Sequence, residues 1–217
     1  MLDSIIFDLD GTLWDSSDEV LKLWNEVVKK HHVSDAITKE QLEGCMGLQN
    51  KEIGQKLLPH LDEKAQEMIL KECNEVECLY LAEHGAQLYQ DVEKVLKALS
   101  EKYKLFIVSN CQSGYIEAFY QSHRLDKYFT DYEHPGRTGL TKGENIKLII
   151  ERNKLENSVY VGDTEGDLKG ARFAGVPFVY AKYGFGQVDE YDYDYVINRF
   201  SELLDLFIDK KILSNNT

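Results

Sequence analysis

The sequence predicts an α/β protein with a doubly wound parallel sheet, a Rossmann-like core, and an inserted four-helix cap domain. Short apolar runs rich in β-branched and aromatic residues alternate with segments of helical spacing, and 10 to 15 residues of helix separate successive runs. Such alternation implies parallel strands joined by right-handed crossovers. The insertion is predicted because residues 15–86 contain four helical segments and no strand.

The first predicted strand is "SIIFDLD" (4–10), an apolar run buried on both faces. The helical spacing that follows over residues 17–32 brings Val20, Trp24 and Val27 to one side. The other three predicted helices of this region have sequence signals at their ends, namely the capping box of Thr38 and Gln41, the caps Asn50 and Asp62, and the stops Pro59 and Gly85.

Strands and helices alternate in the second half of the chain. The predicted strands are 104–110, a weaker 127–133, 157–163, 176–181 and 194–197. The first predicted helix of this half is capped by Asp91 and carries Val92 to Leu99. The other predicted helices are 113–123, 144–153, 165–175 and 200–208. A loop is predicted over 134–143. These elements predict a catalytic core of residues 1–14 and 87–217, with the cap formed by residues 15–86.

Composition restricts the class of partner. The 217 residues carry a formal charge of −13, which argues against nucleic acid as a partner because phosphates would be repelled over most of the surface. No run of about 18 apolar residues exists and the first strand starts almost at Met1, so we expect no membrane span, no signal peptide and a cytoplasmic location. The four cysteines lack zinc spacing, which favours reduced thiols. We expect a monomer or small homo-oligomer.

Polar side chains collect where the predicted strands end, at the edge of a parallel sheet where ligands bind. They are Asp8 and Asp10, Ser109 and Asn110, Asp163 and Asp167, with Lys142 at the start of a neighbouring helix. Clustered carboxylates suit Mg²⁺, and a lysine with a hydroxyl suits phosphate oxygens. One aspartate is then free to attack phosphorus, since phosphoryl transfer needs mainly positioning and charge neutralisation.

These residues resemble four motifs of the haloacid dehalogenase-like hydrolase superfamily. The matching segments are Asp-x-Asp-Gly-Thr at 8–12, Ser109-Asn110, Lys142 and "VGDTEGD" at 161–167. Their order and spacing are similar to those of its helical-cap phosphatases, of which phosphoglycolate phosphatase is a representative, and the resemblance covers nearly the whole chain. The resemblance implies a Mg²⁺-dependent phosphatase that hydrolyses a small phosphorylated metabolite through an aspartyl phosphate.

The resemblance also implies residue roles. Asp8 would be the nucleophile, and Asp10 would protonate the leaving oxygen, activate water and bind metal through its backbone carbonyl. Gly11 would permit the sharp turn after the strand. The remaining assignments are phosphate binding by Thr12, Ser109, Asn110 and Lys142, and metal binding by Asp163 and Asp167, the latter either through water or as a partner of Lys142.

Three further residues are candidates for substrate specificity. Cys45 and Met46 lie in "EGCMGLQNKE" (43–52), a Gly-x-x-Gly turn between two cap helices that can project both side chains over the site. Trp14 stands where the family commonly has a smaller apolar residue. We expect it to pack against the cap or to narrow the entrance.

Other functions stay open as alternatives. A phosphomutase of the β-phosphoglucomutase type shares the chemistry but uses a cap histidine where this chain has Val20. A haloacid dehalogenase resembles the fold but has Tyr in place of Asp10. A phospho-receiver domain, which is not an enzyme, needs neither Asp10 as acid/base nor a cap of about 70 residues.

Overall fold

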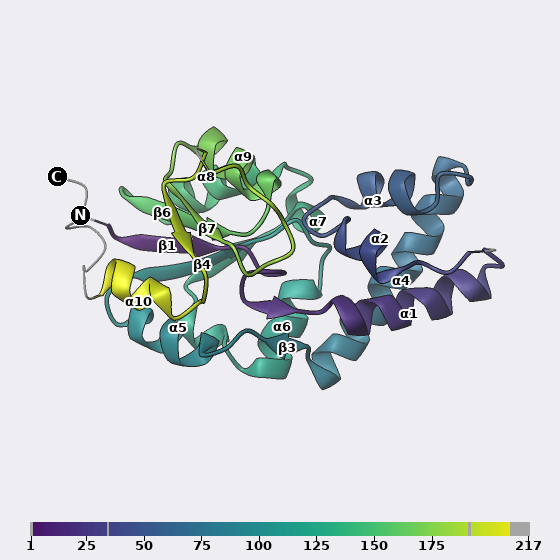
Figure 1. Ribbon diagram of the computed structural model, residues 1–217, viewed down its shortest axis with the longest axis horizontal. Coiled ribbons are helices and arrows are strands. Elements are labelled where there is room, and N and C mark those ends of the chain that lie inside the picture. Colours follow the sequence, from purple (N-terminus) through teal and green to yellow (C-terminus); the bar gives the residue numbers. More distant parts are fainter. Residues whose placement is uncertain (1, 34, 191, 209–217) are drawn as a thin grey trace.

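The computed structural model describes residues 2–33, 35–190 and 192–208, and it confirms the α/β fold class (Figure 1). Six parallel strands form one sheet in the order β5–β4–β1–β6–β7–β8. The strands are β1 (Ser4–Phe7), β4 (Lys104–Val108), β5 (Asp131–Glu133), β6 (Ser158–Gly162), β7 (Phe178–Ala181) and β8 (Tyr195–Ile197).

Helices cover both faces of this sheet. One face packs against α8 (Lys142–Arg152) and α9 (Glu165–Ala174), and the other against α5 (Val92–Ser100), α6 (Tyr115–His123) and α10 (Glu202–Phe207). Successive strand residues point to opposite faces, so Ile5 and Phe7 join the apolar layer with α5 whereas Ile6 joins the layer with α8. The double layer explains why β1 is buried along its whole length.

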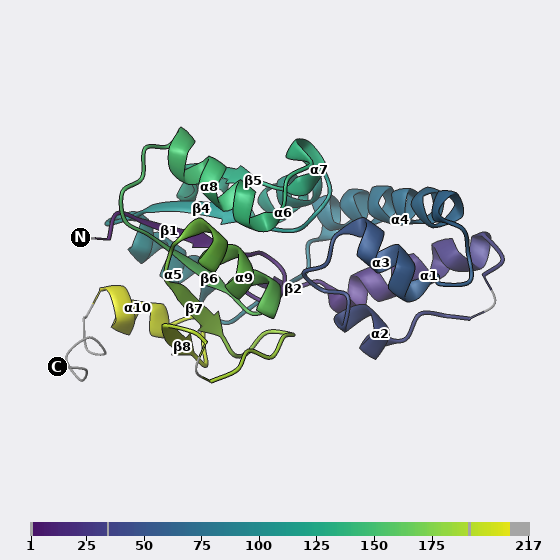
Figure 2. The same ribbon diagram turned by 90° about the horizontal axis from the view of Figure 1, so that it is seen from above.

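Four helices lie to one side of the sheet, beyond the carboxyl end of β1 and away from the chain termini (Figures 1 and 2). They are α1 (Ser17–Lys30), α2 (Lys39–Glu43), α3 (Asn50–Leu57) and α4 (Glu63–His84). The chain leaves the core through β2 (Trp14–Asp15) and returns through β3 (Gln87–Leu88), which pair antiparallel. This pair was not predicted, because two-residue strands show no periodicity. No described helix combines the length and apolarity that crossing a bilayer requires.

Several local predictions need correction. The cap position of α3 is Gln49 rather than Asn50, with Glu52 closing a capping box. Asp91 precedes α5 but makes no capping hydrogen bond, because its backbone is left-handed (φ 63°) and a capping residue normally has extended backbone. The weak strand over 127–133 is a 3₁₀ turn (Asp126–Tyr128) followed by β5, and the loop over 134–143 contains a short helix, α7 (Pro135–Thr138).

Candidate active site

Three aspartates meet at the carboxyl edge of the sheet. Asp8 follows β1 and Asp163 follows the adjacent β6, to which Asp8 is tied by a 2.8 Å hydrogen bond from its N–H to the Val161 carbonyl. Asp167 lies in the first turn of α9. All three side chains are buried, and one oxygen of each lies within 4.8 Å of the others.

Lys142 lies against this cluster at the start of α8, where Thr141 and Glu144 form a capping box. Its Nζ is 2.5 Å from Asp167 Oδ1 and 3.2 Å from Asp8 Oδ1, and its side chain is buried. Burial lowers the pKa of Lys142, but the Asp167 and Asp8 carboxylates outweigh this and raise the pKa above its ordinary value. A cation therefore stays next to Asp8 at any physiological pH.

Asp167 is saturated by protein donors. Its Oδ1 accepts from Lys142 and from the Tyr160 hydroxyl (3.2 Å). Its Oδ2 accepts from the Asp163 N–H (3.1 Å) and from both the N–H and the hydroxyl of Thr164 (2.9 and 2.7 Å). This arrangement favours Asp167 as the partner that holds Lys142 in place over the alternative of a direct metal ligand.

Asp8 and Asp163 carry the features of a cation site. Asp8 Oδ1 is buried without a well-aligned hydrogen-bond donor. Burial and then the charge of Asp167 raise the pKa of Asp8 to about 7, and the same two causes raise the pKa of Asp163 well above its ordinary value. A hard divalent cation would supply the missing compensation, so the residues present fit Mg²⁺.

The turn after β1 leaves no room for a side chain at position 11. Gly11 has φ +76°, and a Cβ there would lie 2.2 Å from Asp163 Oδ2. Thr12 is buried with its hydroxyl 3.5 Å from Asp163 Oδ1. The loop after β7 holds Asp163 from the other side, through the N–H groups of Phe185 (2.7 Å) and Gly186 (3.4 Å). These two backbone donors carry no sequence signal.

Three donors converge on one oxygen of Asp10. Its Oδ1 accepts from the indole N–H of Trp14 (2.8 Å), the hydroxyl of Ser16 (2.9 Å) and the hydroxyl of Tyr115 (2.8 Å). Burial raises the pKa of Asp10 even though these three bonds lower it. With Oδ1 occupied in this way, Oδ2 is left as the oxygen that can exchange a proton.

The position of Trp14 corrects the expectation that it narrows an entrance. The side chain has no exposed surface and packs edge-on against Tyr115, Phe119 and His123, at centroid distances of 5.1 to 5.8 Å. A ring enclosed in this way cannot touch a substrate. Trp14 acts on the site by orienting Asp10.

Ser109 and Asn110 follow β4 and have different surroundings. A hydrogen bond from the buried Ser109 side chain lowers the pKa of Asp8, which places that hydroxyl beside the Asp8 carboxylate. Asn110 instead donates from Nδ2 to the backbone carbonyl of Gly47 (2.8 Å), in the turn between α2 and α3. The Asn110 amide thus joins this turn to the core, and its phosphate-binding role stays a prediction.

Cys45 and Met46 line a cavity of about 60 Å³ that reaches Asp10. The cavity lies between the core and the four helices, and its walls also include Val20, Trp24 and Asn74. Cys45 is 3% exposed. The Gly-x-x-Gly turn thus lies over the site, as the sequence suggested, and a Cβ at Gly47 would lie 3.3 Å from the Thr164 side chain.

Glu77 was missed by the sequence analysis. It lies on the buried face of α4 with Gln66 and Asn74, and its two oxygens accept from Trp24 Nε1 and Gln112 Nε2. Burial raises the pKa of Glu77 to about 8, although these hydrogen bonds lower it. The signal was present in the sequence, because Glu77 follows Cys73 by four residues on the apolar stripe of the helix.

Glu77 should make stability depend on pH. Its folded pKa lies above the ordinary glutamate value of 4.5, so its contribution to stability is full below about pH 4.5 and is lost as pH rises through about 8. Glu77→Gln removes this dependence, because the amide does not titrate. The contact with Gln112 survives, because an inverted Gln112 amide can still pair with the new side chain. We expect the wild type to lose on the order of 4 kcal/mol more than the variant between pH 5 and 9.

Urea unfolding at pH 5, 7 and 9 measures this difference. Glu83→Gln, at an exposed position on the same helix, is the matched control and should follow the wild type. Parallel pH dependence in the wild type and Glu77→Gln would contradict the assignment.

Comparison with known proteins gives a consistent set of relatives. A family model described as haloacid dehalogenase-like hydrolase matches residues 5–181. A phosphoglycolate phosphatase of Aquifex aeolicus is 26% identical over 212 residues, covering 93% of this chain and 95% of the relative. A pyrophosphatase PpaX of Halalkalibacterium halodurans is 26% identical over 219 residues, covering 94% and 96%.

A solved structure has the same fold. The solved structure of a hydrolase of the haloacid dehalogenase-like family from Streptococcus pneumoniae superposes with a TM-score of 0.83 at 23% identity, covering 95% of this chain and 98% of that chain. The match extends over the sheet and the four helices beside it.

Proposed function

Because the chain belongs to the haloacid dehalogenase-like hydrolases, we propose that it is a Mg²⁺-dependent phosphatase that hydrolyses a small phosphorylated metabolite through an aspartyl phosphate on Asp8. The observation that carries this proposal is the position of Asp8 Oδ1, which is buried between Lys142 Nζ at 3.2 Å and the Asp163 carboxylate and has no well-aligned hydrogen-bond donor. The relatives support hydrolysis of phosphate esters. Residues 15–86 would act as the cap over residues 1–14 and 87–217.

The metal site of this proposal uses Asp8, Asp163 and the backbone carbonyl of Asp10. Bound Mg²⁺ would neutralise phosphate oxygens and the buried carboxylates together. Asp167 would serve by fixing Lys142, because its own oxygens are already occupied. Lys142, Ser109 and Thr12 would hold the phosphoryl group by charge and hydrogen bonding.

In the first step Asp8 attacks phosphorus, and the bond from phosphorus to the ester oxygen breaks. Asp10 gives its proton to that oxygen, so the leaving group departs as an alcohol. In the second step Asp10 takes a proton from water as the water oxygen attacks phosphorus, which releases inorganic phosphate and restores Asp8. Trp14, Ser16 and Tyr115 keep Asp10 oriented for both proton transfers.

Hydrolysis is favoured over phosphomutase action by the residue at position 20. Val20 lines the cavity beside Asp10 and offers no group that can exchange a proton. A mutase has to return the phosphoryl group to a second hydroxyl, a step that a residue on the cap assists in the β-phosphoglucomutase type.

Removal of metal tests the proposed function. Phosphate release from 4-nitrophenyl phosphate should stop with excess chelator and return with Mg²⁺, whereas Ca²⁺ should inhibit, because its larger and looser coordination spoils in-line geometry. In the absence of substrate, Mg²⁺ should raise the melting temperature, because it relieves repulsion among the buried carboxylates. Full activity in excess chelator would rule the proposal out.

A further inference from the structure

The cavity beside Asp10 indicates which leaving groups the site accepts, an inference that rests on the proposed phosphatase function. The group attached to the ester oxygen has to lie next to Asp10, which gives that oxygen its proton. A cavity of about 60 Å³ lies there. Its walls come from α1, the α2–α3 turn, α4 and the loop after β4.

The described residues in the walls of this cavity include no cationic side chain that could neutralise an anion. None of the described residues that line it is Lys, Arg or His, and the ionisable carboxyl groups among them are those of Asp10 and Glu77. The N-terminus of α3, at Asn50, already has an anionic partner, since the Gln49 N–H donates to Glu52 Oε2 (3.0 Å). An anionic tail entering here would lose its hydration without gaining a counter-charge.

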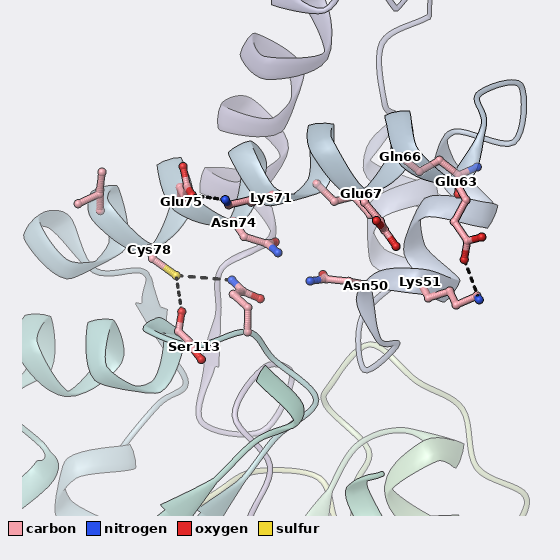
Figure 3. Close-up of a pocket in the computed structure, with 13 residues that line it drawn as sticks. Asn50, Lys51, Glu63, Gln66, Glu67, Lys71, Asn74, Glu75, Cys78 and Ser113 are labelled. Atoms are coloured by element: carbon pink, nitrogen blue, oxygen red, sulfur yellow. Dashed lines mark hydrogen bonds and ion pairs between the residues drawn. The ribbon is translucent and has the colours of Figure 1, made fainter. Parts of the chain in front are cut away.

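A groove that adjoins the cavity is acidic as well. This larger groove of about 820 Å³ shares Asn50, Asn74 and Gln112 with the cavity (Figure 3). Its two lysines are already paired, Lys51 with Glu63 at 2.8 Å and Lys71 with Glu75 at 3.9 Å. Glu67 adds a third carboxylate, so the groove also favours uncharged over anionic molecules.

Two amide oxygens in the cavity lack donors. Asn74 projects from α4 toward α3 and the loop after β4 (Figure 3), and its Oδ1 is buried without a hydrogen-bond partner in a side chain that is 8% exposed. Asn110 Oδ1 is likewise buried and unpartnered, while its Nδ2 is committed to Gly47. Buried acceptors of this kind require an O–H or N–H donor, which a hydroxyl group provides.

We propose that the preferred substrates are phosphate monoesters of small uncharged alcohols that carry a further hydroxyl group, bound through Asn74 and Asn110. The leaving alcohol donates its free hydroxyl to the amide oxygens. Leaving groups with a carboxylate or a second phosphate are disfavoured. This preference differs from the substrates for which the two relatives are named, phosphoglycolate and pyrophosphate. The leaving groups of those substrates, glycolate and phosphate, are both anions.

Three esters of matched size test the proposal with the purified Mg²⁺-loaded protein. They are 2-hydroxyethyl phosphate, 2-phosphoglycolate and 2-aminoethyl phosphate, with 4-nitrophenyl phosphate as the reference. We expect kcat/KM for 2-hydroxyethyl phosphate to exceed that for 2-phosphoglycolate by at least about tenfold, and pyrophosphate to be used as poorly as 2-phosphoglycolate. Equal or faster hydrolysis of 2-phosphoglycolate overturns the proposal, as does a selective preference for 2-aminoethyl phosphate.

A variant of the acceptor gives a second test. Asn74→Leu removes the amide at nearly constant volume and should lower kcat/KM for 2-hydroxyethyl phosphate about tenfold more than that for 4-nitrophenyl phosphate, which has no free hydroxyl group. Asn157→Leu is the matched control, because this exposed residue precedes β6 at the opposite edge of the sheet. Equal losses on both substrates contradict binding through Asn74. Failure to hydrolyse 4-nitrophenyl phosphate would instead contradict the phosphatase function.

Discussion

Asp8→Asn should lower turnover by at least about 10⁴-fold, because an amide at this position cannot form the phosphoenzyme. The substitution keeps the shape of the side chain, so Lys142 and Asp167 retain their contact. It also removes a charge that lies among buried carboxylates. In the absence of metal the variant should therefore unfold at the same temperature as the wild type or higher.

Steady-state kinetics and thermal unfolding separate the loss of the nucleophile from loss of the fold. Asp18→Asn is a suitable control, because Asp18 is exposed on α1 and pairs with Lys39 on the surface. It should show wild-type activity. Substantial turnover by Asp8→Asn would show that another residue attacks phosphorus.

Asp10→Asn should accumulate a phosphorylated protein. The asparagine oxygen can still accept from Trp14, Ser16 and Tyr115, so the side chain stays in place with its amide nitrogen where Oδ2 was. The variant loses the acid for the leaving oxygen and the base for water, each worth about 10²–10⁴-fold. With 4-nitrophenyl phosphate, whose leaving group needs no proton, the first step should survive while the second stalls.

Intact-mass measurement after mixing with 4-nitrophenyl phosphate detects the intermediate directly. One added phosphoryl group is expected in Asp10→Asn and none in Asp8→Asn treated identically. With an alkyl phosphate both steps need Asp10, so turnover of Asp10→Asn should fall further than with the aryl ester. Phosphoprotein in the Asp8 variant, or near-normal turnover in the Asp10 variant, would reverse the assignment.

The fold and the central residues of the candidate site were predictable because their signals are local. A short apolar run in the sequence indicates a buried strand, and a parallel sheet brings the carboxyl ends of its strands to one edge. Asp8, Asp163 and Lys142 were located by this rule together with the order of the motifs, and the structure brings them together. The helix boundaries followed from capping residues such as Thr38 and Asp62, both of which make their capping hydrogen bonds.

Contacts between segments distant in the sequence were decided only by the tertiary structure. Trp14 had no local feature to show that its indole would meet Asp10, and Tyr115 reaches the same oxygen from a helix about a hundred residues away. The contact between Asn110 and Gly47 likewise depends on how the four helices pack on the core, which no local pattern predicts.

The sequence by itself thus determined the α/β fold, the family motifs and the place of the acidic cluster, because apolar periodicity and strand-end chemistry are properties of short segments. Which leaving group the site accepts was decided by tertiary structure. Glu77, Asn74 and Asn110 come from separate elements and form one cavity only when the helices pack on the core. Only that packed arrangement removes water from these groups, and the loss of water is what raises the pKa of a buried carboxyl and makes a buried amide without a partner costly in free energy.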